Sequence, residues 1–130
     1  MDRLILDTGV LVAAVRGRAT VPDDVDVAIP AIVIAEYLAG VHLDQDAGRQ
    51  AAQRAFLDEV LAVIPVHAYD RSVAEHHAAL LAYTARQGQR RGPHDLIVAA
   101  TGRATGRTIL TTDRHAQFGE LPDVNTRTFT

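Results

Sequence analysis

Four acidic residues stand out because each is the one carboxylate of an otherwise uncharged, largely apolar segment. Asp7 interrupts the apolar run that begins at Leu4, and the other three are Glu36, Asp95 and Asp113. An ionised group is costly to bury without a partner, so carboxylates in such segments need an explanation. We predict that the four acids, although far apart in the chain, meet at one site.

Carboxylates that meet in a partly desolvated site repel one another, unless some stay protonated or cations lie between them. Ligation by Asp and Glu oxygens suits Mg²⁺, with Mn²⁺ as a substitute, while the absence of cysteine and of a paired histidine motif argues against zinc. Metal ions held in this way can activate a water and stabilise the leaving oxygen of a phosphodiester. The predicted chemistry is therefore metal-assisted hydrolysis.

Two of the acids also have structural explanations. Glu36 can be a snorkelling or capped residue near a helix end, although its spacing places it on the helix face of Ile32 and Val33. Asp95 falls in the first turn of a helix, where backbone N–H groups and the helix dipole favour any anion. Both alternatives stay open at the level of sequence.

The elements that must position these acids alternate between short apolar runs and helical patterns. We expect strands at 2–6, 27–29, 62–66, 107–110 and 124–127, and helices at 9–15, 31–39, 46–61, 70–87 and 93–104, with Gly40, Gly88 and Gly106 ending three of them. Strands separated by helices imply parallel pairing, so the fold class is α/β, a three-layer α/β/α sandwich around a mostly parallel sheet of four or five strands.

The crevice beyond the carboxyl ends of parallel strands is the usual ligand site of such a fold. Asp7 ends the first strand and Asp113 follows the fourth. If those two strands are neighbours, both acids lie in the crevice, and Glu36 and Asp95 can reach it from helices.

Composition excludes several other classes. The chain of 130 residues is 48% hydrophobic, which predicts a single domain over 1–130. It has no cysteine, no secretory cleavage pattern and no apolar run long enough to span a membrane, so a soluble cytoplasmic protein is expected. All thirteen basic residues are arginine, which excludes phosphate loops and receiver domains that need a lysine.

Two further groups of residues are ambiguous. Arg86, Arg90 and Arg91 flank a glycine-containing loop, and with Arg103 and Arg107 they are candidates for RNA phosphate contacts or a solvated basic edge. His76 and His77 are expected at a solvated edge or in a packed position, because nothing nearby completes a ligand set.

Four segments of this chain resemble the acidic motifs of the PIN domain: 6–8, 30–40, 94–100 and 111–114. In length and order the chain is similar to the VapC-type toxins of bacterial toxin–antitoxin pairs, from Asp2 to about Phe118. The resemblance implies that the metal-binding catalytic acids are Asp7, Glu36, Asp95 and Asp113. It also implies that Thr111 provides a hydroxyl near the metal, and Thr8 stands in a neighbouring motif position from which it can support the acids.

The same resemblance implies a Mg²⁺-dependent endoribonuclease that leaves a 3′-hydroxyl and a 5′-phosphate, inhibits translation and growth, forms a homodimer and binds a VapB-like antitoxin. Many relatives have Asn or Ser where this chain has Gly9, which leaves open what positions the start of the first helix. His94 and His115 are not expected to be general bases, because a metal-bound water already supplies the nucleophile.

The residue content also bears on two other functions. A catalytically silent PIN-like module that binds RNA or a protein partner would be favoured by loss of one of the acids, and the sequence retains all four. A phosphoacceptor signalling domain would need paired acids after the first strand and a late lysine, and the chain has neither.

Overall fold

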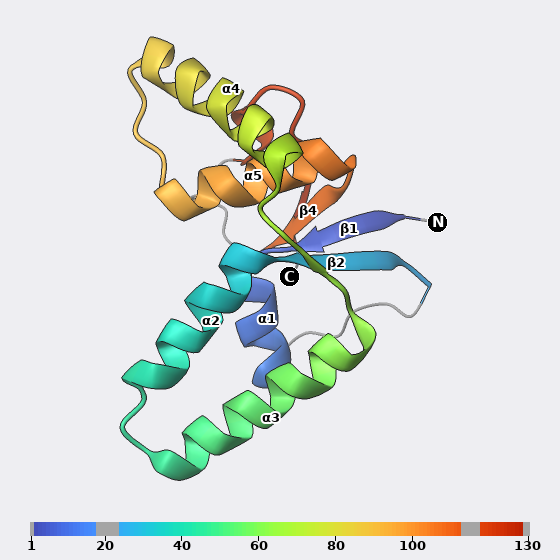
Figure 1. Ribbon diagram of the computed structural model, residues 1–130, viewed down its shortest axis with the longest axis vertical. Coiled ribbons are helices and arrows are strands. Elements are labelled where there is room, and N and C mark those ends of the chain that lie inside the picture. Colours follow the sequence, from blue (N-terminus) through green and yellow to red (C-terminus); the bar gives the residue numbers. More distant parts are fainter. Residues whose placement is uncertain (1, 18–23, 113–117, 129–130) are drawn as a thin grey trace.

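A five-stranded parallel sheet with helices on both faces forms the fold (Figure 1). The computed structural model describes residues 2–17, 24–112 and 118–128. The strands are β1 Arg3–Leu6, β2 Asp26–Pro30, β3 Val66–His67, β4 Thr108–Thr111 and β5 Thr126–Thr128, in the order β3-β2-β1-β4-β5. The helices are α1 Thr8–Val15, α2 Ala31–Leu43, α3 Ala47–Val63, α4 Arg71–Gln87 and α5 Pro93–Thr105, with a 3₁₀ turn, η1, at Phe118–Glu120. The predicted three-layer α/β/α class is confirmed.

The layers follow from the order of the strands. The chain moves outward from β1 through β2 to β3 and then returns to β4 on the other side of β1. Because parallel crossovers are right-handed, this reversal places α1, α2 and α3 on one face and α4 and α5 on the other, as Figure 1 shows. The predicted neighbours β1 and β4 do pair, with Ile5 opposite Ile109.

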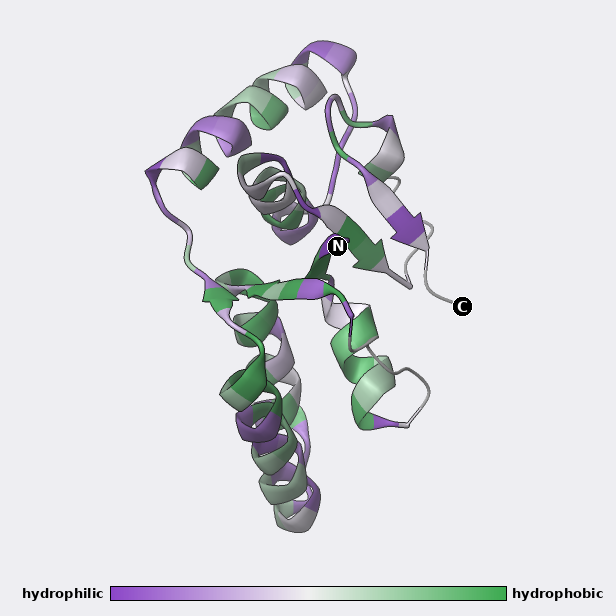
Figure 2. Ribbon diagram, turned by 90° about the vertical axis from the view of Figure 1, so that its right-hand side faces the viewer, coloured by the Kyte–Doolittle hydropathy of each residue, from purple (hydrophilic) through white to green (hydrophobic). Residues whose placement is uncertain are grey.

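The core lies where the central strands meet these helices. Leu4, Ile5 and Leu6 of β1 are all at most 1% exposed, and Ile29 and Ile109 of the flanking strands are fully buried. A central parallel strand is covered on both faces, which is why its sequence is continuously apolar rather than alternating. Figure 2 shows the hydrophobic residues concentrated in the central strands and in α1 and α2.

The helix ends predicted from capping residues are mostly confirmed. Asp46 accepts a hydrogen bond from the backbone N–H of Arg49, and Asp70 accepts one from that of Val73. Gly88 ends α4 in the left-handed conformation, at φ 65°. These caps satisfy backbone groups that the helices themselves leave unpaired.

The expectation that Gly40 ends the second helix was wrong, because α2 continues to Leu43. Gly40 is exposed, and a methyl group there would meet nothing within 4 Å. Tyr37 and Val41 on either side are buried, so the apolar face of α2 runs past the glycine. Packing of that face outweighs the weak helix propensity of one residue.

The expected strand at 62–66 is also corrected. Helix α3 extends to Val63, and β3 is only the two residues Val66 and His67. Ile64 is extended at φ −112° and ψ 121°, as expected for a residue that precedes a proline. Pro65 therefore sets the end of α3, and its carbonyl accepts from the N–H of Ile29 in β2.

Candidate functional site

The candidate site lies at the carboxyl edge of the sheet, where the strand order reverses. Strand β1 lies between β2 and β4, and its last residue, Leu6, pairs with Leu110. Asp7 and Thr111 therefore emerge side by side at this edge. This is the position at which open parallel sheets bind ligands.

Asp7 is held from three directions. Its Oδ1 accepts from the backbone N–H of Thr8 at 2.8 Å, which makes Asp7 the N-cap of α1. Its Oδ2 accepts from Thr111 Oγ1 at 2.9 Å, and its own N–H donates to the carbonyl of Leu110 at 3.0 Å. The residue is only 6% exposed. Asp7 itself thus positions the start of the first helix, which answers the question left by Gly9.

Glu36 lies between α1 and α5. Thr8 Oγ1 donates to Glu36 Oε1 at 2.7 Å, and His94 Nδ1 lies 3.2 Å from Oε2. The Glu36 side chain is 29% exposed. Because both of its oxygens have partners within the site, Glu36 is not a snorkelling residue that reaches into solvent.

Asp95 lies in the first turn of α5, as predicted, and is half-buried. Its carboxylate folds back over Gly92, the N-cap residue, so closely that an added Cβ at Gly92 would lie 2.8 Å from Asp95 Oδ2. Gly92 has no side chain to cap the helix, and the dipole of α5 favours a negative charge at this end. The preceding residue, His94, contacts Glu36, so the first turn of α5 lies next to α2 at this edge.

One of the four predicted acids falls in a part of the chain that the structure does not describe. Asp113 and His115 lie outside the described residues. The described site therefore consists of three of the four predicted acids, Asp7, Glu36 and Asp95, with the hydroxyl groups of Thr8 and Thr111 donating to two of them.

The donor chemistry of this edge suits a hard divalent cation. Carboxylates predominate, hydroxyl donors orient two of them, and the chain has no thiolate. Within 2–17, 24–112 and 118–128, no three His, Asp or Glu side chains are close enough to form a complete metal-binding group. The described contacts instead link Asp7 to Thr8, Thr8 to Glu36, and Glu36 to His94, the residue that precedes Asp95 in α5.

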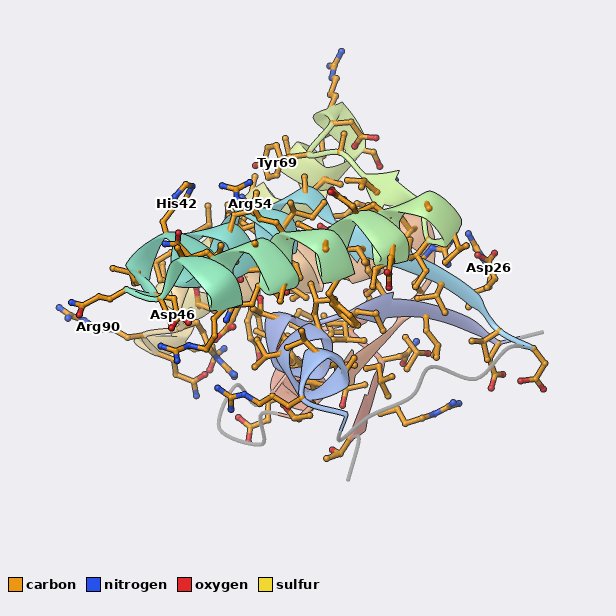
Figure 3. The ribbon with its side chains drawn as sticks, turned by 90° about the horizontal axis from the view of Figure 1, so that it is seen from below. Asp26, His42, Asp46, Arg54, Tyr69 and Arg90 are labelled. Carbon is orange, nitrogen blue, oxygen red and sulfur yellow. The ribbon has the colours of Figure 1, made fainter. Side chains whose placement is uncertain are left out.

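The arginine candidates separate into different environments. Arg86 and Arg90 are exposed, and Figure 3 shows Arg90 projecting away from the body of the molecule. Arg91 is different, because its side chain is only 7% exposed and its Nη2 lies 3.4 Å from Glu120 Oε2 of η1. Arg91 therefore joins the loop before α5 to η1 instead of forming part of a solvated edge.

Arg107 acts at the opposite edge of the sheet. Its Nη1 donates to the carbonyl of Leu4 at 3.2 Å, and to the carbonyl and Oδ1 of Asp26 at 2.9 and 3.0 Å. Asp26 begins β2, so this cluster lies at the amino ends of the strands, far in Figure 3 from Arg90. Arg107 thus links β1 and β2 at the end of the sheet away from Asp7, with a side chain that is only 10% exposed.

The histidines of α4 have the packed position that was one of the two expectations. His77 Nδ1 lies 2.8 Å from the hydroxyl of Tyr69, and the two rings meet edge to face. Burial lowers the pKa of His77, because the charged imidazolium is poorly solvated there. Both histidines are half-buried on α4.

Sequence reasoning missed three features of the site. His94 was considered only as a possible base, whereas its described contact is with Glu36. Gly92 and Gly9 were not recognised as positions at which a polar atom closely approaches the backbone. In the sequence, the signal for these close approaches is only that Gly9 lies two residues after Asp7 and Gly92 three residues before Asp95.

Comparison with known proteins gives a consistent result. The family model described as the PIN domain matches residues 4–122. The fold is similar to that of VapBC2 from Rickettsia felis bound to a DNA fragment from its promoter, with a TM-score of 0.85, 20% identity, and coverage of 98% of this chain and 99% of that chain. It is also similar to FitAcB from Neisseria gonorrhoeae, with a TM-score of 0.80, 24% identity and coverage of 95% of both chains.

A further similar structure is VapBC-5 from Mycobacterium tuberculosis, a member of the VapBC family of toxin–antitoxin systems. Here the TM-score is 0.78, the identity 25%, and the coverage 99% of this chain and 98% of that chain. A search of curated proteins gives no match. In the part of the chain that the structure describes, none of the helices combines the length and the apolar character needed to cross a bilayer.

Proposed function

Since the chain belongs to the PIN domain family, we propose that it is a VapC-type toxin, a metal-dependent endoribonuclease of a toxin–antitoxin pair. The observation that carries the proposal is the arrangement of two carboxylates and two hydroxyl groups at the strand-order reversal. Thr111 donates to Asp7, and Thr8 donates to Glu36. Carboxylates that hydroxyl donors orient in a ligand-binding crevice are typical of a catalytic centre, and the capping of α1 by Asp7 explains the position of that residue but not its charge.

The proposed cofactor is Mg²⁺, with Mn²⁺ as a substitute. Asp7, Glu36, Asp95 and Asp113 would hold it, and when bound it supplies an activated water and charge stabilisation at the scissile phosphate. The chain contributes orientation. Thr111 fixes one carboxylate oxygen of Asp7, and the α1 cap fixes the other.

RNA is the proposed substrate, cut at a phosphodiester to leave a 3′-hydroxyl and a 5′-phosphate. Single-stranded or loop regions suit an open edge of this kind, because their backbone can approach the acids without strand separation. The exposed residues Arg86 and Arg90 are candidates for distant phosphate contacts. Cleavage of cellular RNA would inhibit translation and growth.

The proposed partners are a VapB-like antitoxin and a second copy of the chain. The proposed location of the complex is the cytoplasm. The similarity to VapBC and FitAcB structures supports the antitoxin. A hollow of about 370 Å³ next to α1, between α2 and α3, offers a concave surface with an apolar wall at Val12, Val15 and Val41. Apolar side chains of a partner segment can be buried there.

The test is RNA cleavage by the purified protein and by its Asp7→Asn variant. Asparagine is also a good helix N-cap, so the variant should keep α1 while losing the charge. Its carbonyl oxygen can accept from the N–H of Thr8, and its NH₂ group can donate to Thr111 Oγ1. We expect cleavage by the wild type with Mg²⁺ or Mn²⁺, no cleavage with a chelator, and at least a hundredfold lower kcat in Asp7→Asn at unchanged melting temperature, on the order seen when a central catalytic group is removed.

Sequencing of RNA 5′ ends after induced expression of the two proteins would identify the cut sites. Undiminished cleavage by Asp7→Asn would refute the catalytic assignment. RNA binding without metal-dependent cleavage by the wild type would favour the alternative, a catalytically silent PIN-like module.

A further inference from the structure

We propose that Thr112 is a positioning residue, whose hydroxyl takes the space that a side chain at position 9 would need and thereby holds the end of β4 against the Asp7 turn. The proposal rests on the proposed function, because it concerns how that site is kept in register. It assigns a role to a pair of residues, Gly9 and Thr112, of which neither carries a charge.

The evidence is the close approach of Thr112 to the first turn of α1. An ideal Cβ built on Gly9 would overlap Thr112 Oγ1, whereas it would lie 3.6 Å from Thr112 Cβ, an ordinary contact. The conflict therefore involves a single atom, the hydroxyl oxygen. Position 9 can carry a side chain only if that oxygen moves or is removed.

Backbone conformation does not explain the glycine. Among the described residues, the glycines with positive φ are Gly17, Gly88 and Gly106. Gly9 is within α1 and has no such requirement. Glycine in a helix interior costs about 1 kcal/mol relative to alanine, so helix propensity gives no reason for glycine at position 9, whereas the approach of Thr112 does.

Thr112 directly follows two residues that contact the acid. The preceding residue, Thr111, donates to Asp7 Oδ2 at 2.9 Å, and Leu110 accepts from the N–H of Asp7 at 3.0 Å. Three consecutive residues at the end of β4 thus contact the turn at 7–9. A shift of the backbone at Thr112 would therefore act on the adjacent hydrogen bond from Thr111 to Asp7.

The experiment is a double-mutant cycle of Gly9→Ala and Thr112→Ala. Gly9→Ala should lower kcat for RNA cleavage by about 10- to 100-fold, since displacements of less than 1 Å in a catalytic site have effects of this size, and KM should change little. Thr112→Ala should have a smaller effect. The double variant should recover most of the kcat that Gly9→Ala loses, whereas Gly9→Ala with Thr112→Ser should not, because serine retains the oxygen.

Gly102→Ala is the matched control. A Cβ at Gly102 would lie 3.1 Å from Ile109 Cγ1 and 3.3 Å from the carbonyl of Arg107, so it crowds α5 against β4 away from the acids. This variant should lose stability but keep its kcat below its melting temperature. A merely structural role of Gly9 would give the same result as Gly102.

A second measurement separates this inference from the proposed function. Hydrogen exchange of the Asp7 amide, which donates to Leu110, should speed up in Gly9→Ala and return towards the wild-type rate in the double variant. If the wild type does not cleave RNA, the proposed function is wrong, and amide exchange still decides the positioning role. A double variant no better than Gly9→Ala in either measurement would overturn it.

Discussion

Gly92→Ala is expected to move one carboxylate of the site while leaving the fold intact. Gly92 has φ −57° and ψ 130°, an extended conformation that alanine adopts freely and that suits the residue before Pro93. Alanine loses less chain entropy than glycine on folding, but it is the poorer N-cap residue. These opposing effects should keep the change in the free energy of unfolding within about 1 kcal/mol.

The substitution should have its main effect on the position of the Asp95 carboxylate. The new Cβ would lie 2.8 Å from Asp95 Oδ2, whereas ordinary contacts begin at 3.4 Å, so the carboxylate must retreat by about 0.6 Å. The clashing atom is the end of a flexible side chain, which makes the retreat cheap for the fold. In a catalytic site, a displacement of this size should lower kcat by about 10- to 100-fold.

The assay is steady-state cleavage of a labelled RNA, with thermal unfolding of the same samples. Gly40→Ala is the control, because a Cβ there meets nothing within 4 Å and the position is exposed in α2. It should raise stability by up to about 1 kcal/mol and leave kcat unchanged. Wild-type kcat in Gly92→Ala would show that the position of Asp95 does not matter to the reaction and would refute this reasoning.

Three further predictions concern Glu36, a surface ion pair and an exposed arginine. Thr8→Val removes the donor at 2.7 Å from Glu36 and should lower kcat about tenfold and the free energy of unfolding by about 1 kcal/mol, measured by cleavage and urea titration. In Asp44→Asn, the free energy of unfolding should fall less than in the wild type between about pH 4 and pH 2, as measured by unfolding at each pH. The reason is that hydrogen bonds from Arg49 lower the Asp44 pKa from 3.8 to about 2, so the stability they provide is present above the ordinary pKa and lost as pH falls through the folded one. Arg90→Gln should weaken RNA binding and reduce the slope of log affinity against log salt by about one, if this exposed arginine contacts a phosphate, as filter binding at several salt concentrations would show.

The parts of the site that sequence could predict depend on strand ends. Asp7 follows a continuously apolar run and Thr111 ends another, so the topology of a parallel sheet alone places them at one edge. That they are adjacent depended on β1 and β4 being neighbours, which the structure confirms. The position of Asp95 in a first helical turn was equally readable, because Pro93 marks the start of α5.

The parts that sequence could not predict depend on rotations and distances between elements. The hydrogen bond from Thr8 to Glu36 requires a particular orientation of α2 against α1, which no local pattern specifies. The burial of Arg91 depends on η1 returning past α5 to bring Glu120 beside it. The prediction that Gly40 ends α2 was wrong for the same reason, because a glycine ends a helix only if the packing of the helix does not continue beyond it.

Asp7 shows how closely fold and chemistry overlap at this edge. One of its oxygens caps α1 and the other accepts from Thr111, so the residue would be needed at this position even if its charge had no use. An amide could fill both roles, because its carbonyl oxygen can accept from the N–H of Thr8 and its NH₂ group can donate to Thr111 Oγ1. A negative charge is harder to explain on structural grounds, because at 6% exposure it costs more to bury than an amide does. Folding therefore does not explain why this position has a carboxylate, whose burial costs more free energy than that of asparagine. A bound cation would offset this extra cost.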